Sequence, residues 1–180
     1  MPQRVHILGA SGCGVTTLGR SLAEAWSRPY HDTDDFYWQP TNPPFRIKRP
    51  PEDRLHRLRD ALLTSERWIL GGAVDGWGDA LIRSFDAVVF LFAPTETRVA
   101  RLRARERKRF GDRIARGGDM HEHHERFIEW ASAYETAEMG GARSRVRHEE
   151  WLTKLRCQVV RIDAAPAADE VAANLRAALR

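Results

Sequence analysis

The chain has 180 residues and a net charge of +4, with 42% hydrophobic and 30% charged residues. This mixture can form a hydrophobic core, which excludes disorder throughout, and no apolar run approaches the ~18 residues of a membrane-spanning helix. The basic balance suits phosphate-bearing ligands or nucleic acid without deciding between them. Two cysteines are too few for a disulfide scaffold. Because a strand-like segment follows the first residues directly, with no signal peptide, we expect reduced thiols, no membrane partner and a cytoplasmic location.

The first half of the chain alternates between strand and helix patterns. A buried strand is predicted at Arg4–Leu8 and ends in a glycine-rich turn. From Thr16 onward apolar residues recur every four positions, which indicates a helix. Pro29–Asp32 is a candidate second strand. Aromatic residues and prolines then fill positions 36–44, which argues against a helix there, and Pro50-Pro51 predicts the start of the next one.

Two further strands are predicted at Trp68–Leu70 and at Asp86–Phe92. The apolar run of the second implies burial on both faces, as in a parallel sheet. After it, Thr95 is expected to cap a helix that begins with Glu96.

The C-terminal part continues the alternation. Asp119 and Glu122 are predicted to form the capping pair of a helix whose Phe127, Trp130 and Tyr134 face the core, with Gly140-Gly141 at its end. The last predicted elements are a helix at Arg145–Leu155, a strand at Cys157–Ile162 and a helix at Asp169–Leu179. Strands alternating with helices predict an α/β fold with a parallel sheet.

The most informative stretch has the spacing of a phosphate-binding loop: glycine, four residues, glycine, one residue, then a hydroxyl residue. Glycines let successive backbone N–H groups converge on an anion, and the following helix adds its positive N-terminal end. A tight strand–helix turn without a ligand is the alternative. The predicted nucleotide-binding residues are Gly9, Ser11, Gly12, Cys13, Gly14, Val15, Thr16 and Thr17.

This loop departs from the usual pattern at one position, because Val15 stands where a lysine normally precedes the hydroxyl residue. That lysine reaches the β- and γ-phosphates. Two outcomes follow from its loss. Either a cation from elsewhere in the chain fills the role, or the site binds a nucleotide and transfers phosphate weakly or not at all.

The loop, its position in the chain and the chain length resemble the P-loop small-molecule kinases of the adenylate kinase and shikimate kinase-like group. The resemblance is strongest to bacterial adenylate kinase-like P-loop ATPases whose loop also lacks the lysine. It implies a five-stranded parallel sheet with helices on both faces, ATP with Mg²⁺, and a basic helical lid. Within one domain of residues 1–180, it makes 36–64 an acceptor-binding insertion and 98–118 the lid.

The same resemblance assigns roles near the second strand. Asp32-Thr33-Asp34 matches the Asp-x-Asp turn of shikimate kinase-like enzymes. It implies that Thr16 and Asp32 hold Mg²⁺, partly through water, and that Asp34 binds an acceptor hydroxyl and is the candidate base. Gly72 resembles the glycine that lines the acceptor pocket. The alternatives are ordinary turn chemistry for the aspartates and a simple strand end for the glycine.

Nine basic and two acidic residues between Arg98 and Arg116 give this segment the composition of a kinase lid. Arg101 and Arg105 share one helical face and are the predicted phosphate clamp, and Lys48 is a second candidate to replace the missing lysine. Arg46 and Arg49 are candidates for holding an anionic acceptor. A solvated, charged helix face is the alternative, although a segment of net charge +7 repels itself unless anions visit it.

The first functional hypothesis is an ATP-dependent kinase acting on a small acceptor, either a nucleoside monophosphate or a hydroxyl compound. The second is a nucleotide-binding ATPase or regulatory switch with weak or no phosphotransfer, as Val15 would allow. A nucleic-acid-binding function is disfavoured, because the positive charge is local and the phosphate loop would go unexplained.

Overall fold

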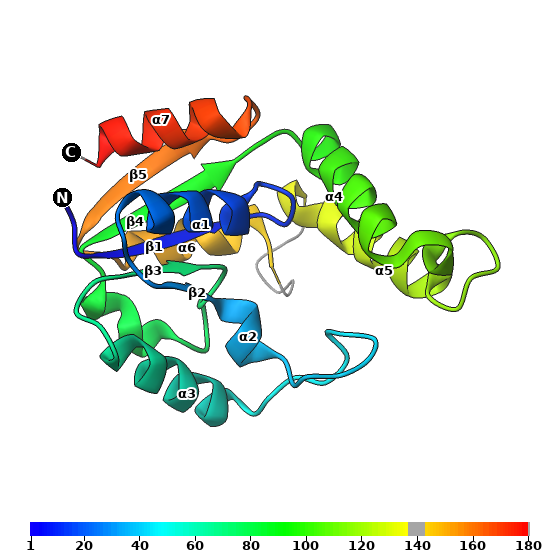
Figure 1. Cartoon of the computed structure of the whole chain (residues 1–180), viewed down its shortest axis with the longest axis horizontal. Coiled ribbons are helices and arrows are strands. Elements are labelled where there is room, and N and C mark those ends of the chain that lie inside the picture. Colours follow the sequence, from blue (N-terminus) through cyan, green and yellow to red (C-terminus); the bar gives the residue numbers. More distant parts are fainter. Residues whose placement is uncertain (137–142, 180) are drawn as a thin grey trace.

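A computed structural model describes residues 1–136 and 143–179, and its centre is a twisted parallel sheet (Figure 1). Within these residues the sheet has five strands in the order β2-β3-β1-β4-β5, and every neighbouring pair is parallel. In that order the strands are β2 (Tyr30–Asp32), β3 (Trp68–Gly71), β1 (Arg4–Gly9), β4 (Ala87–Phe92) and β5 (Gln158–Asp163). The predicted α/β fold with a five-stranded parallel sheet is therefore confirmed.

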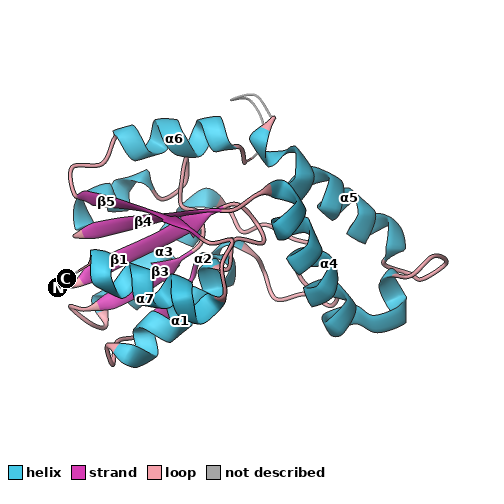
Figure 2. Cartoon of the chain, turned by 90° about the horizontal axis from the view of Figure 1, so that it is seen from above, coloured by secondary structure: helices cyan, strands magenta, loops and turns pink. Residues whose placement is uncertain are grey.

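Helices cover both faces of this sheet (Figure 2). One face carries α1 (Val15–Ala25) and α7 (Ala168–Ala178), and the other carries α3 (Pro51–Leu63) and α6 (Arg145–Thr153). The remaining short elements are α2 (Thr33–Tyr37), η1 (Asp79–Ser84), η2 (Gly111–Ile114) and η3 (Ala133–Glu135). Within the described part of the chain, no helix is both long enough and apolar enough to cross a membrane.

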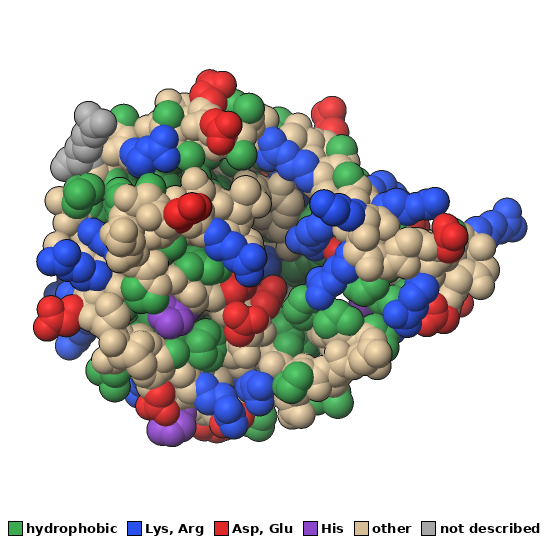
Figure 3. All heavy atoms as spheres, in the orientation of Figure 1, with side chains coloured by type: hydrophobic (Ala, Val, Ile, Leu, Met, Phe, Trp, Pro, Cys, Tyr) green, Lys and Arg blue, Asp and Glu red, His purple; other side chains and the backbone are tan. Residues whose placement is uncertain are grey.

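Two further helices, α4 (Thr95–Phe110) and α5 (His121–Ser132), pack against each other and project from the carboxyl end of the sheet. Their contact has a small core of its own around Leu102, Ile128 and Ala131. Figure 3 shows a hollow between this projecting pair and the body of the molecule, with acidic side chains gathered inside it. The segment 98–118, predicted to be a basic lid, comprises most of α4 and the turn η2 that follows it, and α5 lies beyond its predicted end.

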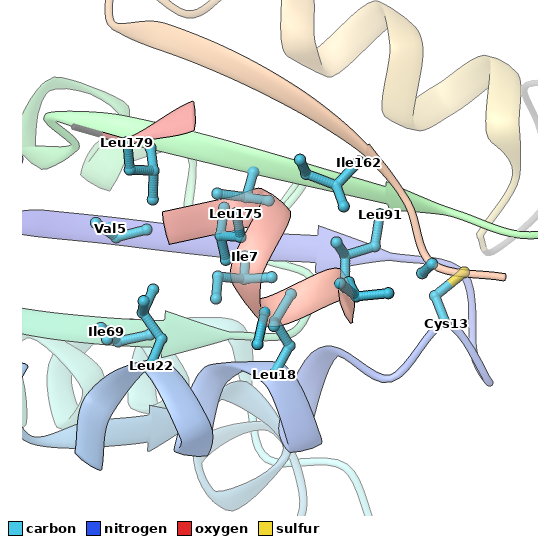
Figure 4. Packing of buried hydrophobic residues seen from close by; sticks show 14 of the residues in the cluster. Val5, Ile7, Cys13, Leu18, Leu22, Ile69, Leu91, Ile162, Leu175 and Leu179 are labelled. Carbon is cyan, nitrogen blue, oxygen red and sulfur yellow. The ribbon is translucent and has the colours of Figure 1, made fainter. Parts of the chain in front are cut away.

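The core explains why the strands form where they do. Val5 and Ile7 of β1 pack under α1 and α7, whereas Leu8 belongs to the opposite layer with Leu58 of α3. Figure 4 shows the first of these layers, in which Leu22 and Leu175 approach β1 from two helices. Burial of both strand faces is the arrangement that a continuous apolar run in a parallel sheet requires.

Some local predictions were wrong, and side-chain partners explain most of these errors. Phe36 and Tyr37 lie in the short helix α2, because the Asp32 carboxylate caps it by accepting a hydrogen bond from the Asp34 amide at 3.1 Å. Thr95 does not cap α4 but is its first residue, and its hydroxyl accepts a hydrogen bond from Arg98.

Further along the chain, Asp119 does not cap α5, because its carboxylate pairs with Arg113 at 2.7 Å. Trp130 is 37% exposed rather than core, while Tyr134 is buried as predicted. The predicted helix end at Gly140-Gly141 lies outside the described residues.

Two fully buried histidines lie between the sheet and α6: His6 in β1 and His148 in α6. The Nδ1 atom of His6 lies 3.1 Å from the Leu70 carbonyl oxygen, and the Nδ1 atom of His148 lies 2.9 Å from the Tyr134 hydroxyl. Burial lowers the pKa of His6 to about 4, partly offset by the hydrogen bond to Leu70. Burial also lowers the pKa of His148 well below its ordinary value, and the nearby Asp75 carboxylate opposes this shift. Both side chains are neutral in the folded protein at pH 7.

Acid should therefore destabilise the fold through these two side chains. Below the ordinary histidine pKa of 6.5 the unfolded chain binds protons that the folded protein excludes. Their contribution to the free energy of unfolding should fall by up to about 1.4 kcal/mol per pH unit per histidine as the pH drops from 6.5 towards 4. Urea unfolding between pH 7.5 and 4.5 measures this slope. The slope should become shallower in His148→Asn and stay unchanged in His56→Gln, a change at an exposed histidine. An identical slope in His148→Asn and the wild-type protein would contradict this account.

Candidate nucleotide and acceptor site

The glycine-rich loop connects β1 to α1 and adopts backbone conformations that only glycine accepts readily. Gly12 and Gly14 both have φ of +89°, in the left-handed region. Gly14 also begins α1, since its carbonyl oxygen accepts the first helical hydrogen bond from the Leu18 amide at 2.9 Å. The N-terminal end of α1 thus meets a loop of backbone amides, which is the geometry that binds phosphate.

Close packing places a second requirement on Gly12. A Cβ atom there would lie 2.5 Å from the carbonyl oxygen of Arg98, in the first turn of α4. A Cβ atom on Gly14 would meet nothing within 4 Å, so its requirement is conformational alone. The loop is therefore held directly against the start of the lid helix.

Cys13 points from this loop into the core, where it packs among the residues under α1 and α7 (Figure 4). Burial raises the pKa of its thiol to about 11, with Arg98 opposing the shift. Cys13 is therefore a neutral thiol, and it can contribute to a ligand site only through its backbone.

The structure brings Thr16 and Asp32, the predicted metal-binding pair, into contact. Thr16 donates a hydrogen bond from Oγ1 to Asp32 Oδ2 at 3.0 Å, and the Tyr30 hydroxyl donates to the same oxygen at 3.1 Å. The contact arises because Thr16 lies in the first turn of α1 while Asp32 ends the edge strand β2.

A hydroxyl and a carboxylate are oxygen donors of the kind that Mg²⁺ binds. No group of three or more metal-binding side chains occurs among the residues that the structure describes. The pair nevertheless fits Mg²⁺, because this ion commonly takes one or two protein oxygens and completes its shell with water and substrate phosphates.

Asp34 lies two residues beyond Asp32 and is exposed in the first turn of α2. The surrounding protein displaces part of its hydration and raises its pKa, as does the carboxylate of Asp32. The charge of Arg143 and a hydrogen bond from the Trp38 side chain act in the opposite direction. Trp38 and Arg143 are therefore neighbours of Asp34 that the sequence analysis did not connect with it.

Gly72 follows β3 and has φ of +110°. Its amide donates to the Ile7 carbonyl oxygen at 3.0 Å, and a Cβ atom there would collide with Thr33 Oγ1. Glycine at this position thus lets the end of β3 approach the start of α2, beside the Asp32-Thr33-Asp34 turn.

Of the two predicted clamp arginines, Arg101 is already engaged elsewhere. Its guanidinium donates hydrogen bonds of 2.6–3.2 Å to three carbonyl oxygens in the loop between β5 and α7, those of Ala164, Ala165 and Pro166. In this structure it holds that loop and is not free to clamp a phosphate. Arg105 pairs with Glu106 at 2.9 Å but keeps 56% of its side chain exposed.

The predicted acceptor cations lie on the insertion. The Lys48 ammonium is 5.9 Å from the ring centres of both Tyr37 and Trp38. Arg46 reaches towards α5, with its Nη1 atom 3.4 Å from His123 Nδ1. Arg49 is 4.0 Å from Asp53. The structure therefore places Lys48 near the aromatic rings that follow Asp34, and it pairs Arg49 with Asp53 of α3.

The basic lid is also more neutral than its own sequence indicates. Acidic residues outside the segment pair with two of its arginines: Arg103 with Glu125, and Arg113 with Asp119. Arg107 pairs with Asp112, an acidic residue of the segment itself. These exposed pairs lower the self-repulsion of the segment, so its charge alone does not require a bound anion.

Arg98 is the residue of this region that the sequence analysis missed. It is fully buried and donates a hydrogen bond from Nη1 to the carbonyl oxygen of Ser11, inside the phosphate loop. No sequence signal separates it from the eight other basic residues of the same segment.

The chain has the fold of the P-loop small-molecule kinase superfamily. Three features define this class: a parallel sheet with this strand order, a glycine-rich loop between β1 and α1, and a helical lid after β4. A family model described as AAA domain matches residues 5–139, and the chain belongs to this family.

Similar proteins agree with this assignment. The chain is 44% identical over 163 residues to the uncharacterized protein YqaC of Bacillus subtilis (strain 168), covering 91% of this chain and 89% of that protein. It is 30% identical over 115 residues to shikimate kinase 2 of Sodalis glossinidius, covering 58% of this chain and 65% of that enzyme. A solved shikimate kinase from Bacteroides thetaiotaomicron has the same fold, with a TM-score of 0.61, 17% identity and 99% coverage of both chains.

Replacing Gly12 with alanine should damage the fold more than the backbone conformation alone explains. Gly117 has a similar φ of +86° but open space around its Cβ position, so Gly117→Ala is the matched control. We expect Gly117→Ala to lower the free energy of unfolding by about 1–2 kcal/mol, and Gly12→Ala to lower it by about 3 kcal/mol or more, because the loop must also move away from Arg98. Urea unfolding of both variants measures the difference. Equal losses would show that the loop does not depend on the contact with Arg98.

Proposed function

We propose that the protein is an ATP-dependent kinase that transfers the γ-phosphoryl group to a small acceptor, either a hydroxyl compound or a nucleoside monophosphate. The observation that carries this proposal is the contact between Thr16 and Asp32 at the phosphate loop, 3.0 Å between their oxygens, with Asp34 beside it. Similarity to shikimate kinase 2 supports a hydroxyl-bearing acceptor.

In this proposal the nucleotide lies along the loop. The backbone amides between Gly9 and Thr17 hold the β- and γ-phosphates, at the positive end of α1. Thr16 and Asp32 would hold Mg²⁺, and the ion would supply positive charge that neutralises part of the phosphate charge. Neither role needs the side chain of position 15, where valine stands in this sequence.

Asp34 takes the acceptor side of the reaction. Its carboxylate accepts a hydrogen bond from the attacking hydroxyl and receives the proton as the new O–P bond forms. The bond between the γ-phosphorus and the bridging oxygen of ADP breaks in the same step, and ADP leaves. The raised pKa of Asp34 suits this role, because a carboxylate of ordinary pKa is a weaker proton acceptor near neutral pH.

The remaining groups line the acceptor and the transferred phosphate. Gly72 brings the end of β3 close to the same turn. Lys48, Arg46 and Arg49 supply positive charge on the insertion, and Arg105, an exposed arginine of the lid, is proposed to bind the transferred phosphate. Arg101 would join it only after releasing the loop between β5 and α7.

The proposal is tested by acceptor-stimulated ADP release. Purified protein with ATP and Mg²⁺ is screened against shikimate-like polyols, hexonates and nucleoside monophosphates, and at least one acceptor should raise ADP release while gaining phosphate. With that acceptor, Asp34→Asn should lower turnover about 100-fold or more, the usual range for loss of a general base.

Asp35→Asn is the matched control, since Asp35 is an exposed carboxylate in the same helix with no proposed role. It should leave turnover within about threefold of the wild-type value, as expected of most surface substitutions. Saturable ATP binding with ADP release that no acceptor stimulates would contradict the kinase proposal and favour a nucleotide-binding switch.

A further inference from the structure

We infer that Arg98 is a positioning residue of the phosphate loop, which supplies from beneath the loop the fixed positive charge that a P-loop lysine would supply at position 15. The inference rests on the proposed binding of ATP at this loop. It assigns the compensating charge to a buried residue, not to the exposed arginines of the lid.

The first observation is the environment of the Arg98 side chain, which is fully buried at 0% exposure. Its guanidinium makes four hydrogen bonds, all to neutral oxygens. Nε donates to the Ala93 carbonyl at 3.3 Å, Nη1 donates to the carbonyls of Ser11 at 3.2 Å and Ala131 at 3.1 Å, and Nη2 donates to Thr95 Oγ1 at 3.0 Å.

These hydrogen bonds satisfy the donors but leave the charge uncompensated. No carboxylate oxygen of residues 1–136 or 143–179 lies within 4.0 Å of the Arg98 guanidinium, in contrast to Arg103, Arg105, Arg107 and Arg113 of the lid. The Tyr134 ring, 5.2 Å from the Arg98 Cζ atom, adds a favourable cation–π contact without adding a negative charge. A buried and unpaired cation is costly unless an anion shares its surroundings.

The second observation links this charge to the direction of the loop amides. The Ser11 carbonyl points at Arg98, and in a trans peptide the N–H of the next residue points the opposite way. The Gly12 amide is therefore turned away from Arg98. The close approach of the Gly12 backbone to the Arg98 carbonyl, which leaves no room for a Cβ atom, fixes the peptide in that orientation.

The triphosphate is the anion that fits this arrangement. Arg98 lies one peptide layer from the loop amides, so its charge reaches the phosphates through a short, poorly screened path rather than by direct contact. Val15 itself carries no charge. Arg98 beneath the loop thus supplies the positive charge that the lysine would supply, while the backbone amides of the loop bind the phosphates.

The test is a charge-relocation cycle on the full chain. ATP, ADP and adenosine binding are measured by calorimetry for the wild-type protein, Arg98→Met, Val15→Lys and the double variant. Arg98→Met should weaken ATP binding about 10- to 100-fold, weaken ADP binding less, and leave adenosine binding unchanged, because the lost interaction is with phosphate charge.

The double variant separates charge from structure. Adding Val15→Lys to Arg98→Met should recover at least tenfold in ATP affinity without restoring the thermal midpoint lost by Arg98→Met. Val15→Lys should raise ATP affinity less in the wild-type protein than in the Arg98→Met variant. A merely structural Arg98 would predict no recovery, because a lysine at position 15 cannot replace its four buried hydrogen bonds.

Each outcome decides a separate point. If the wild-type protein binds no ATP, the proposed function fails first. If it binds ATP and Arg98→Met folds and binds equally well, or the double variant recovers nothing, the role assigned to Arg98 is wrong. If Arg98→Met does not fold, the cycle is run with Arg98→Gln. A gain in ATP affinity above about 100-fold from Val15→Lys alone would also overturn the inference, because it would show that no other residue replaces the missing charge.

Discussion

The peptide between Ser11 and Gly12 is held from both directions, and the candidate site depends on that constraint. The Arg98 guanidinium binds the Ser11 carbonyl, and the Arg98 backbone closes the space beside Gly12. The same arginine lies in the first turn of the lid helix α4. The phosphate loop, the lid and the end of β4 are consequently one packed unit, so the orientation of the loop amides is set before a ligand arrives.

A second contact brings the two sides of the site together. Thr16 lies in the first turn of α1 next to the sheet centre, and Asp32 ends the edge strand β2, yet their oxygens are 3.0 Å apart. Tyr30 supports the contact from within β2 by donating to the same carboxylate oxygen. Asp34 and the aromatic rings of the insertion then continue the surface away from the loop, so a nucleotide on one side and an acceptor on the other would meet at this pair.

The sequence predicted the parts of this protein that depend on local pattern. Buried parallel strands have continuous apolar runs, and a phosphate loop needs glycines at fixed positions, so β4 and Gly9–Thr16 could be located directly. Predictions that depend on a side chain's partner were less successful. Thr95 and Asp119 have the residue types of helix caps, but Arg98 and Arg113 bind their oxygens instead. Arg98 itself resembles every other arginine of its segment until the fold buries it.

The account's central claim is that backbone amides of the loop hold the phosphates of a nucleotide, and hydrogen exchange tests it most directly. Exchange of peptides covering Gly9–Thr17 is followed by mass spectrometry with no ligand, with adenosine, and with ATP and Mg²⁺. The account predicts slower exchange in this segment with ATP and Mg²⁺ but not with adenosine. Unchanged exchange of the loop at saturating ATP and Mg²⁺ would contradict it.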